Sequence, residues 1–89
     1  MLMLGSMCAE QRVAFFLLDM SQRYQAQGYS SSEYVLRMTR KDIGSYLGLN
    51  LETVSRTLSQ LQRAGMLEVE GRNVKLRDRA AVSQLIENV

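Results

Sequence analysis

The fold is decided by Thr39-Arg-Lys-Asp-Ile-Gly-Ser-Tyr-Leu-Gly-Leu-Asn-Leu-Glu-Thr-Val-Ser-Arg56, a stretch that reads as two short helices joined by a tight turn. Gly44 leaves a side-chain-free patch on the first helix, against which the second helix can cross closely. Gly48 supplies the positive φ that such a turn needs. Together these features predict a helix-turn-helix.

Thr39 and Asn50 mark where the two helices of this motif begin. Thr39 is followed three residues later by Asp42, which makes a variant of the capping box, and Asn50 is a favourable N-cap. We expect the second helix to run to about Ala64 and to be stopped by Gly65. The apolar residues expected to face inward from the first helix and the turn are Ile43, Leu47 and Leu49.

The segment before the motif predicts one helix and one strand. Apolar residues recur at helical spacing from Cys8 to about Gln27, and Gly28 is suited to the left-handed cap that ends a helix. Phe15 and Leu18 widen the apolar face of this helix, which indicates either a neighbouring domain or subunit packed there or a deeply buried helix. Residues 34–38 are β-branched and aromatic enough for a short strand.

The segment after the motif predicts a hairpin and a last helix. Residues 67–76 alternate apolar and polar side chains around a turn at Gly71-Arg72-Asn73, which is the pattern of a two-stranded hairpin, here a wing. Asp78 is suited to cap a final helix that covers the core from the outside through Val82 and Leu85. The predicted fold class is therefore mainly α with a small β wing, a winged helix-turn-helix.

The composition is that of one small folded domain, because the 89 residues are 46% hydrophobic and 22% charged and can bury a single core. No apolar run reaches the roughly 18 residues of a membrane-spanning helix, and the opening Met1–Leu4 lacks the basic flank of a signal peptide. We therefore expect no membrane association and a cytoplasmic protein. Cys8 is the only cysteine and histidine is absent, so we expect no metal, no cofactor and no catalytic site.

The formal charge of +2 is too small by itself to indicate a polyanionic partner. Cations nevertheless exceed anions between Thr39 and Arg77, which is a modest basic footprint of the kind that nucleic-acid-binding domains carry. A mixed solvated surface explains the same charges equally well. The charge therefore supports a nucleic-acid partner without deciding for it.

One face of the predicted second helix carries side chains that can read DNA. On a helical wheel Glu52, Ser55 and Arg56 form a polar stripe opposite an apolar stripe that includes Val54 and Leu58. Arg56 can donate two hydrogen bonds to guanine O6 and N7, Glu52 can accept one from the cytosine N4 amine, and Ser55 can contact either kind of base. The alternative for Glu52 and Arg56 is an i, i+4 ion pair on an ordinary solvated surface.

Polar residues around this face are candidates for phosphate contacts, which set the register of a protein on DNA without reading its sequence. They come from the two helix N-termini and from the turn of the wing: Thr39, Arg40, Asn50, Thr53 and Arg72. Lys75, on the second strand of the wing, is better explained as protection against edge-to-edge pairing of strands.

The sequence resembles a specific family, the C-terminal DNA-binding domain of bacterial Crp/Fnr transcription regulators, in its Fnr-like branch. The resemblance covers about residues 9–76 and is carried by residues 39–49, by residues 52–56 and by Met66-Leu67 before the wing. It implies a homodimer on double-stranded DNA, whose recognition helices, about residues 51–64 here, enter successive major grooves of a palindrome.

The resemblance also implies which bases are read. The family's Glu, Ser and Arg that read the half-site match Glu52, Ser55 and Arg56. The Crp branch has an Arg before the Glu, where Leu51 stands here, and a Gly where Ser55 stands. The implied half-site is therefore the Fnr-type TTGAT rather than the Crp-type TGTGA.

Members of the family carry an N-terminal sensor β-barrel and a long dimerisation helix, so the resemblance implies that this chain is a fragment. Residues 1–8 would be a remnant of the dimerisation helix and hinge, and residues 9–89 the winged helix-turn-helix domain. Cys8 alone cannot hold the iron–sulfur cluster of oxygen-sensing members. The loop 28–33 lies where some relatives touch RNA polymerase.

Two functional hypotheses follow. The first is sequence-specific binding of double-stranded DNA for transcription regulation. The alternative is a winged-helix protein–protein interaction module, which is indicated by the low net charge and by the wide apolar face of the first helix. Such a module would show no salt-dependent affinity for duplex DNA.

Overall fold

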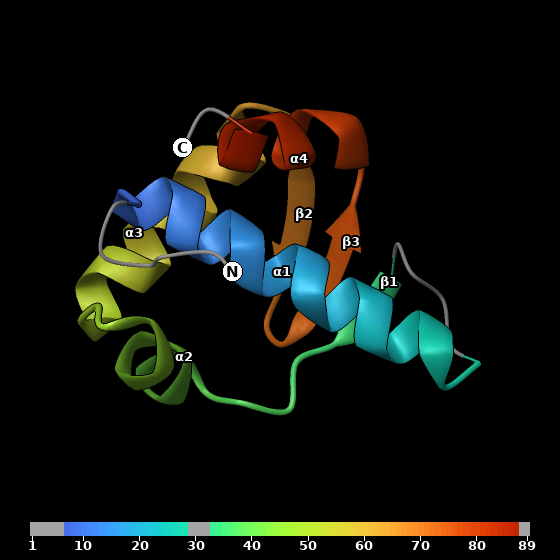
Figure 1. Cartoon of the computed structure of the whole chain (residues 1–89). Coiled ribbons are helices and arrows are strands. Elements are labelled where there is room, and N and C mark those ends of the chain that lie inside the picture. Colours follow the sequence, from blue (N-terminus) through green and yellow to red (C-terminus); the bar gives the residue numbers. More distant parts are fainter. Residues whose placement is uncertain (1–6, 29–32, 88–89) are drawn as a thin grey trace.

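The computed structural model describes residues 7–28 and 33–87, which form four helices and three short strands (Figure 1). In chain order these are α1 (Ala9–Ala26), β1 (Glu33–Val35), α2 (Arg40–Leu47), α3 (Leu51–Arg63), β2 (Leu67–Glu70), β3 (Asn73–Leu76) and α4 (Arg79–Glu87). The fold is mainly α with a small sheet, as predicted. Most of the predicted dimerisation-helix remnant and most of the loop 28–33 lie outside the described residues.

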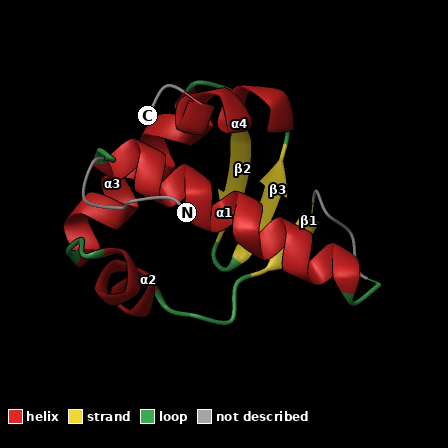
Figure 2. Ribbon diagram, viewed as in Figure 1, coloured by secondary structure: helices red, strands yellow, loops and turns green. Residues whose placement is uncertain are grey.

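The helix α1 runs across the domain and contacts α2, α3, α4 and β1 (Figure 2). It begins after Cys8, whose backbone N–H donates to Oε1 of Gln11 at 3.0 Å. It ends at Ala26, within one residue of the predicted limit, and Gly28 follows with a φ of 89°. A glycine in this left-handed conformation closes a helix without steric cost, as the sequence predicts.

The three strands form one antiparallel sheet with the order β1-β3-β2, so β3 is the central strand (Figure 2). In the wing, Glu70 pairs with Asn73, which leaves Gly71 and Arg72 as the turn. The prediction that Asn73 belongs to the turn is therefore wrong, because this residue begins β3. Gly71 has a φ of 62°, and a positive φ is what two-residue hairpin turns require.

The strand β1 is shorter than the predicted strand 34–38. Val35 pairs with Asn73, the first residue of β3, so Leu36 lies opposite the turn of the wing rather than opposite a strand. The backbone N–H of Leu36 donates to the carbonyl of Arg72 at 2.7 Å, and the chain then leaves the sheet toward α2. The length of the partner strand thus sets the end of β1.

A helix side chain covers a backbone group on each edge strand. The N–H of Val69 in β2 donates to Oε1 of Gln62 in α3 at 2.9 Å, and the hydroxyl of Tyr24 in α1 donates to the carbonyl of Val35 in β1 at 3.1 Å. Free backbone groups on an edge strand can pair with another chain. These two contacts therefore oppose edge-to-edge association.

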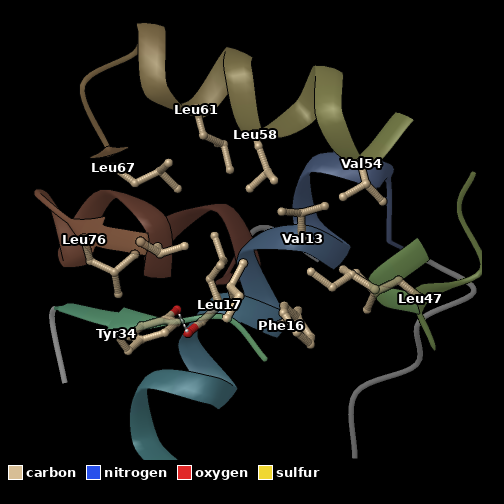
Figure 3. Packing of buried hydrophobic residues seen from close by; sticks show 13 residues of the cluster. Val13, Phe16, Leu17, Tyr34, Leu47, Val54, Leu58, Leu61, Leu67 and Leu76 are labelled. Carbon is tan, nitrogen blue, oxygen red and sulfur yellow. Dashed lines mark hydrogen bonds between the residues drawn. The ribbon is translucent and has the colours of Figure 1, made fainter. Parts of the chain in front are cut away.

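The core lies between the helices and the inner face of the sheet (Figure 3). Tyr34 brings a hydroxyl into it, which donates to the carbonyl of Leu17 at 2.7 Å, and its ring stacks on Tyr24 with 5.2 Å between centroids. Burial raises the pKa of the Tyr34 phenol, so the hydroxyl stays protonated and can donate. The other buried members of the cluster are Val13, Phe16, Leu36, Ile43, Leu47, Val54, Leu58, Leu61, Leu67, Val74 and Leu76.

The helix α4 packs against α1. The predicted cap of α4 is confirmed, because Oδ1 of Asp78 accepts the backbone N–H three residues later at 3.0 Å. Nε2 of Gln11 in α1 donates to the carbonyl of Leu85 in α4 at 3.0 Å. Phe15 and Leu18 are half-buried and line a shallow groove of about 420 Å³ between the two helices. A helix of the same chain thus borders the wide apolar face of α1, and Phe15 and Leu18 stay partly exposed in the groove.

Candidate nucleic-acid interface

The turn between α2 and α3 is built on two glycines. Gly48 ends α2 with a φ of 73°, and the N–H of Leu49 donates to the carbonyl of Gly44 at 2.7 Å. A Cβ on Gly44 would stand 2.5 Å from the carbonyl oxygen of Leu49, so a side chain there would force the backbone apart. The sequence predicts a close approach at Gly44 by the second helix, whereas the approaching backbone is that of the turn.

The helix α3 anchors one face in the core and turns the opposite face to solvent. Its buried side chains are Val54, Thr57, Leu58 and Leu61. Glu52 and Arg56 are exposed and Ser55 is half-buried. We call these three residues the reading face; they lie within the first two turns of α3, the part of a recognition helix where base contacts concentrate.

Glu52 and Arg56 do not form the ion pair that was the alternative explanation for their spacing. Within the part of the chain that the structure describes, the ion pairs lie elsewhere, on α1 and on the sheet with the residue that follows it. The guanidinium of Arg56 and the carboxylate of Glu52 are therefore not engaged with each other.

The capping residues of α2 and α3 keep hydrogen-bond donors at the two helix N-termini. Oδ1 of Asn50 accepts the N–H of Thr53 at 2.7 Å, and the hydroxyl oxygen of Thr39 accepts the N–H of Asp42 at 3.1 Å. Each cap uses an oxygen as acceptor, so the amide N–H groups of Asn50 and the hydroxyl hydrogen of Thr39 stay able to donate. Both capping residues are exposed, whereas Thr53 is half-buried.

The two predicted phosphate-contacting arginines differ in their surroundings. Arg40, the first residue of α2, is half-buried, and its Nε is buried without a hydrogen-bond partner among the described residues. Arg72 is exposed at the turn of the wing. In Figure 3, α2, marked by Leu47, lies near the N-terminal end of α3, and β2, marked by Leu67, lies near its C-terminal end. The helix that carries Arg40 and the hairpin that carries Arg72 thus lie near opposite ends of α3.

Lys75 lies on the outer face of the sheet between two acidic residues. It pairs in register with Glu33 on β1 and with Glu68 on β2, and all three side chains are exposed. Cross-strand neighbours of opposite charge stabilise a sheet, which agrees with a structural role for Lys75. Arg72, beyond this acidic face, is the better candidate of the two for a phosphate contact.

Leu51 is a further candidate for a contact with DNA bases. In the sequence it serves only to distinguish the Fnr-like branch of the family from the Crp branch. It is the first residue of α3 and is 52% exposed, although it is a large apolar side chain. On the helical wheel it falls between Leu58 of the apolar stripe and Ser55 of the reading face, closer to Leu58. Periodicity therefore assigns Leu51 to the edge of the buried stripe, and its exposure at the start of α3 shows only in the structure.

No three side chains of the metal-ligating types converge anywhere in residues 7–28 and 33–87. Over the same residues, no helix is both long enough and apolar enough to cross a membrane. Cys8 is an exposed free thiol at the start of α1.

Comparison with known families gives one match that covers most of the chain. A family model for the Crp-like helix-turn-helix domain matches residues 11–85.

The chain is 56% identical over 82 residues to the transcriptional regulatory protein btr of Bordetella pertussis, a match that covers 92% of this chain and 34% of that protein. It is 44% identical over 84 residues to the fumarate and nitrate reduction regulatory protein of Escherichia coli K12, covering 94% of this chain and 34% of that protein.

Solved structures of similar proteins have the same fold. FixK2 from Bradyrhizobium japonicum superposes with a TM-score of 0.82 at 47% identity, over 92% of this chain and 40% of that one. The catabolite activator protein of Thermus thermophilus superposes with a TM-score of 0.70 at 26% identity, over 90% of this chain and 34% of that one. The chain spans about a third of the length of the curated relatives cited above.

Proposed function

This chain belongs to the family of Crp-like helix-turn-helix domains, and we propose that it reads a specific sequence in double-stranded DNA. Domains of this family bind DNA in transcription regulation and are not enzymes. In this proposal α3 lies in the major groove. The observation that carries it is the reading face: three side chains suited to base edges stand on the outer side of a helix whose other side is anchored in the core.

The half-site that we propose is TTGAT-like. It contains one guanine, whose O6 and N7 match the two donors of the Arg56 guanidinium. The cytosine paired with that guanine presents an N4 amine, which matches the carboxylate of Glu52. Ser55 can contact a neighbouring base of either kind. A single G·C pair read from both strands by Arg56 and Glu52 would also offset the repulsion between the carboxylate and the phosphates.

We also propose that Leu51 contacts the methyl group of a thymine in this half-site. The thymine C5-methyl is the apolar group that the major groove presents, and an exposed leucine beside the reading face has the matching chemistry. Thr39, Arg40, Asn50, Thr53 and Arg72 would contact phosphates and set the register of α3.

The match to about a third of each relative supports the further proposal that the chain is the DNA-binding part of a longer regulator. In it, residues 1–8 would be the end of a dimerisation helix and the hinge that follows it. Two copies would bind the two half-sites of a palindrome, and residues 28–33 would contact RNA polymerase. Such a regulator would act in the cytoplasm. The alternative of a protein-interaction module loses part of its motivation, because α4 packs on the apolar face of α1 that indicated it.

The test of this function is a salt titration of binding to three duplexes, carrying a TTGAT palindrome, a TGTGA palindrome and a scrambled sequence. Fluorescence anisotropy would be recorded for the chain alone and for a version joined to a parallel coiled coil at its N-terminus. Joining two half-site readers can raise affinity by about 10² to 10⁴, so the dimerised form is the sensitive one. We expect it to prefer TTGAT, with an affinity that falls as salt rises. Equal or absent binding to all three duplexes would favour the interaction module.

A further inference from the structure

The guanidinium of Arg12 connects the segment just before α1 with the end of α2, where the turn of the helix-turn-helix begins. Arg12 lies in the first turns of α1 and is half-buried. Its Nε donates to the carbonyl of Met7 at 3.1 Å, just before α1, and its Nη1 donates to the carbonyl of Leu47 at 3.0 Å, at the end of α2. These two carbonyls belong to segments that are far apart in the sequence.

The hydrogen bond from Arg12 to the carbonyl of Leu47 stabilises the C-terminal end of α2. Leu47 is the last residue of this helix, where carbonyl groups lack intrahelical partners and the helix dipole is negative. The cationic guanidinium supplies both a donor and the favourable charge. A Cβ at Gly48 would stand 3.3 Å from the same Nη1, so the guanidinium also lies directly against the turn that leads to α3.

From these contacts we propose that Arg12 is a positioning residue for DNA recognition. It holds the end of α2, and through the turn the start of α3, in a fixed relation to the segment that enters the domain at Met7. The guanidinium suits this task because it is planar and presents several donors in a rigid fork, whereas a lysine ammonium is a single point donor on a flexible stem. The proposal rests on the proposed function, since positioning matters only if α3 reads DNA.

The first test measures affinity for the TTGAT duplex with Arg12→Gln and Arg12→Lys, each at a temperature well below its own unfolding midpoint. Arg23→Gln is the matched control, because Arg23 lies on the same helix and its ion pair with Asp19 stays on the surface of α1. We expect both Arg12 variants to bind at least about fivefold more weakly, the lower end of typical coupling between linked sites, while Arg23→Gln binds almost as the parent does. The slope of log Kd against log salt should stay unchanged in all of them.

Two results would overturn the proposal. Parent-like affinity of the folded Arg12 variants would mean that Arg12 serves only the stability of the domain. A salt slope that falls by about 1 would mean that Arg12 itself contacts a phosphate. If Arg12→Gln does not fold, Arg12→Lys carries the test, because it keeps the charge and a donor.

A second readout does not depend on DNA. Hydrogen exchange of the Leu49 amide, which donates to the carbonyl of Gly44, reports on the turn. We expect Arg12→Lys to speed this exchange while leaving amides of α4 as they are in the parent chain. Uniformly faster exchange in all helices would contradict a local positioning role. If the parent chain binds none of the duplexes, the proposed function fails, and the exchange experiment still decides whether Arg12 holds the turn.

Discussion

At the scale of single residues, the proposed specificity depends on the exposed side chains of the reading face. Arg56 and Glu52 are exposed and not paired with each other, so neither must break an existing ion pair before it can meet a base. Exposure alone is common on helices. What distinguishes this face is that its donors and acceptors complement one G·C pair in the major groove.

We predict that Arg56→Ala will lose about 1–3 kcal/mol of discrimination at the guanine of the half-site. Arg56→Lys keeps the charge but not the two-pronged geometry, so it should lose most of the discrimination and retain the salt dependence. The measurement is anisotropy with the TTGAT duplex and with a duplex in which that G·C pair is changed. An equal loss of affinity on both duplexes with Arg56→Lys would argue against base reading.

We predict that Leu51 makes the affinity sensitive to thymine methyl groups. Replacing thymine by uracil in the half-site removes the methyl and leaves every hydrogen-bonding group in place, so the parent chain should bind the uracil duplex more weakly. Leu51→Ala should show a smaller difference between the two duplexes, because most of the apolar side chain is gone. A uracil effect of the same size in both proteins would show that the methyl acts through DNA shape instead.

At the scale of the secondary-structure elements, the caps bond the helix with one atom and can serve the proposed interface with another. Asn50 accepts the N–H of Thr53 with its side-chain oxygen, and its amide nitrogen is a donor beside the reading face. The two cations of the wing also differ in their surroundings. Lys75 lies between Glu33 and Glu68 on the sheet, whereas Arg72 is exposed at the turn and is the candidate for a phosphate contact.

The variants Asn50→Ser and Asn50→Ala separate the two tasks of the cap. Serine caps a helix about as well as asparagine, so we expect Asn50→Ser to keep the free energy of unfolding within about 0.5 kcal/mol, whereas Asn50→Ala should lower it by about 1 kcal/mol. Both variants should bind all duplexes more weakly, because alanine has no donor and the hydroxyl of serine, which can still donate, lies one bond closer to the backbone than the amide nitrogen of asparagine. Thermal unfolding and anisotropy check the two effects separately. Parent-like affinity in Asn50→Ser would remove Asn50 from the phosphate contacts.

At the scale of the whole molecule, the net charge of +2 gives little general attraction to DNA, so the placement of individual cations matters. The outer face of the sheet carries Glu33, Glu68 and Glu70, all exposed, which disfavours close approach of phosphates there. Cationic phosphate contacts are expected instead from the start of α2 and from the turn of the wing.

We predict that Arg72→Ala will weaken binding to all duplexes alike and reduce the salt slope by about 1. Lys75→Ala is the matched control, since it removes the same charge from the same hairpin at a position with acidic neighbours. It should change the salt slope less. The measurement is log Kd against log salt for the three proteins, and a larger change in slope for Lys75→Ala would reverse the assignment of the two residues.

The sequence by itself determined the parts of this protein that depend on local chemistry. Thr39 and Asn50 cap their helices as predicted because a capping side chain bonds a backbone group only three residues away. Gly48 ends α2 with a positive φ for a reason that is equally local. The composition of the exposed face of α3 follows from helical periodicity, so the candidate base-reading residues could be named in advance; their role on DNA stays a prediction.

Only the tertiary structure decided what depends on residues far apart in the sequence. The end of β1 at Val35 is set by where β3 begins, and the close neighbour of Gly44 is set by the path of the turn. The packing of α4 on α1 and the bridge that Arg12 makes between Met7 and Leu47 likewise join distant segments. No periodicity or spacing in the sequence predicts such contacts. They form when separate elements pack, and the packing geometry determines which residues meet.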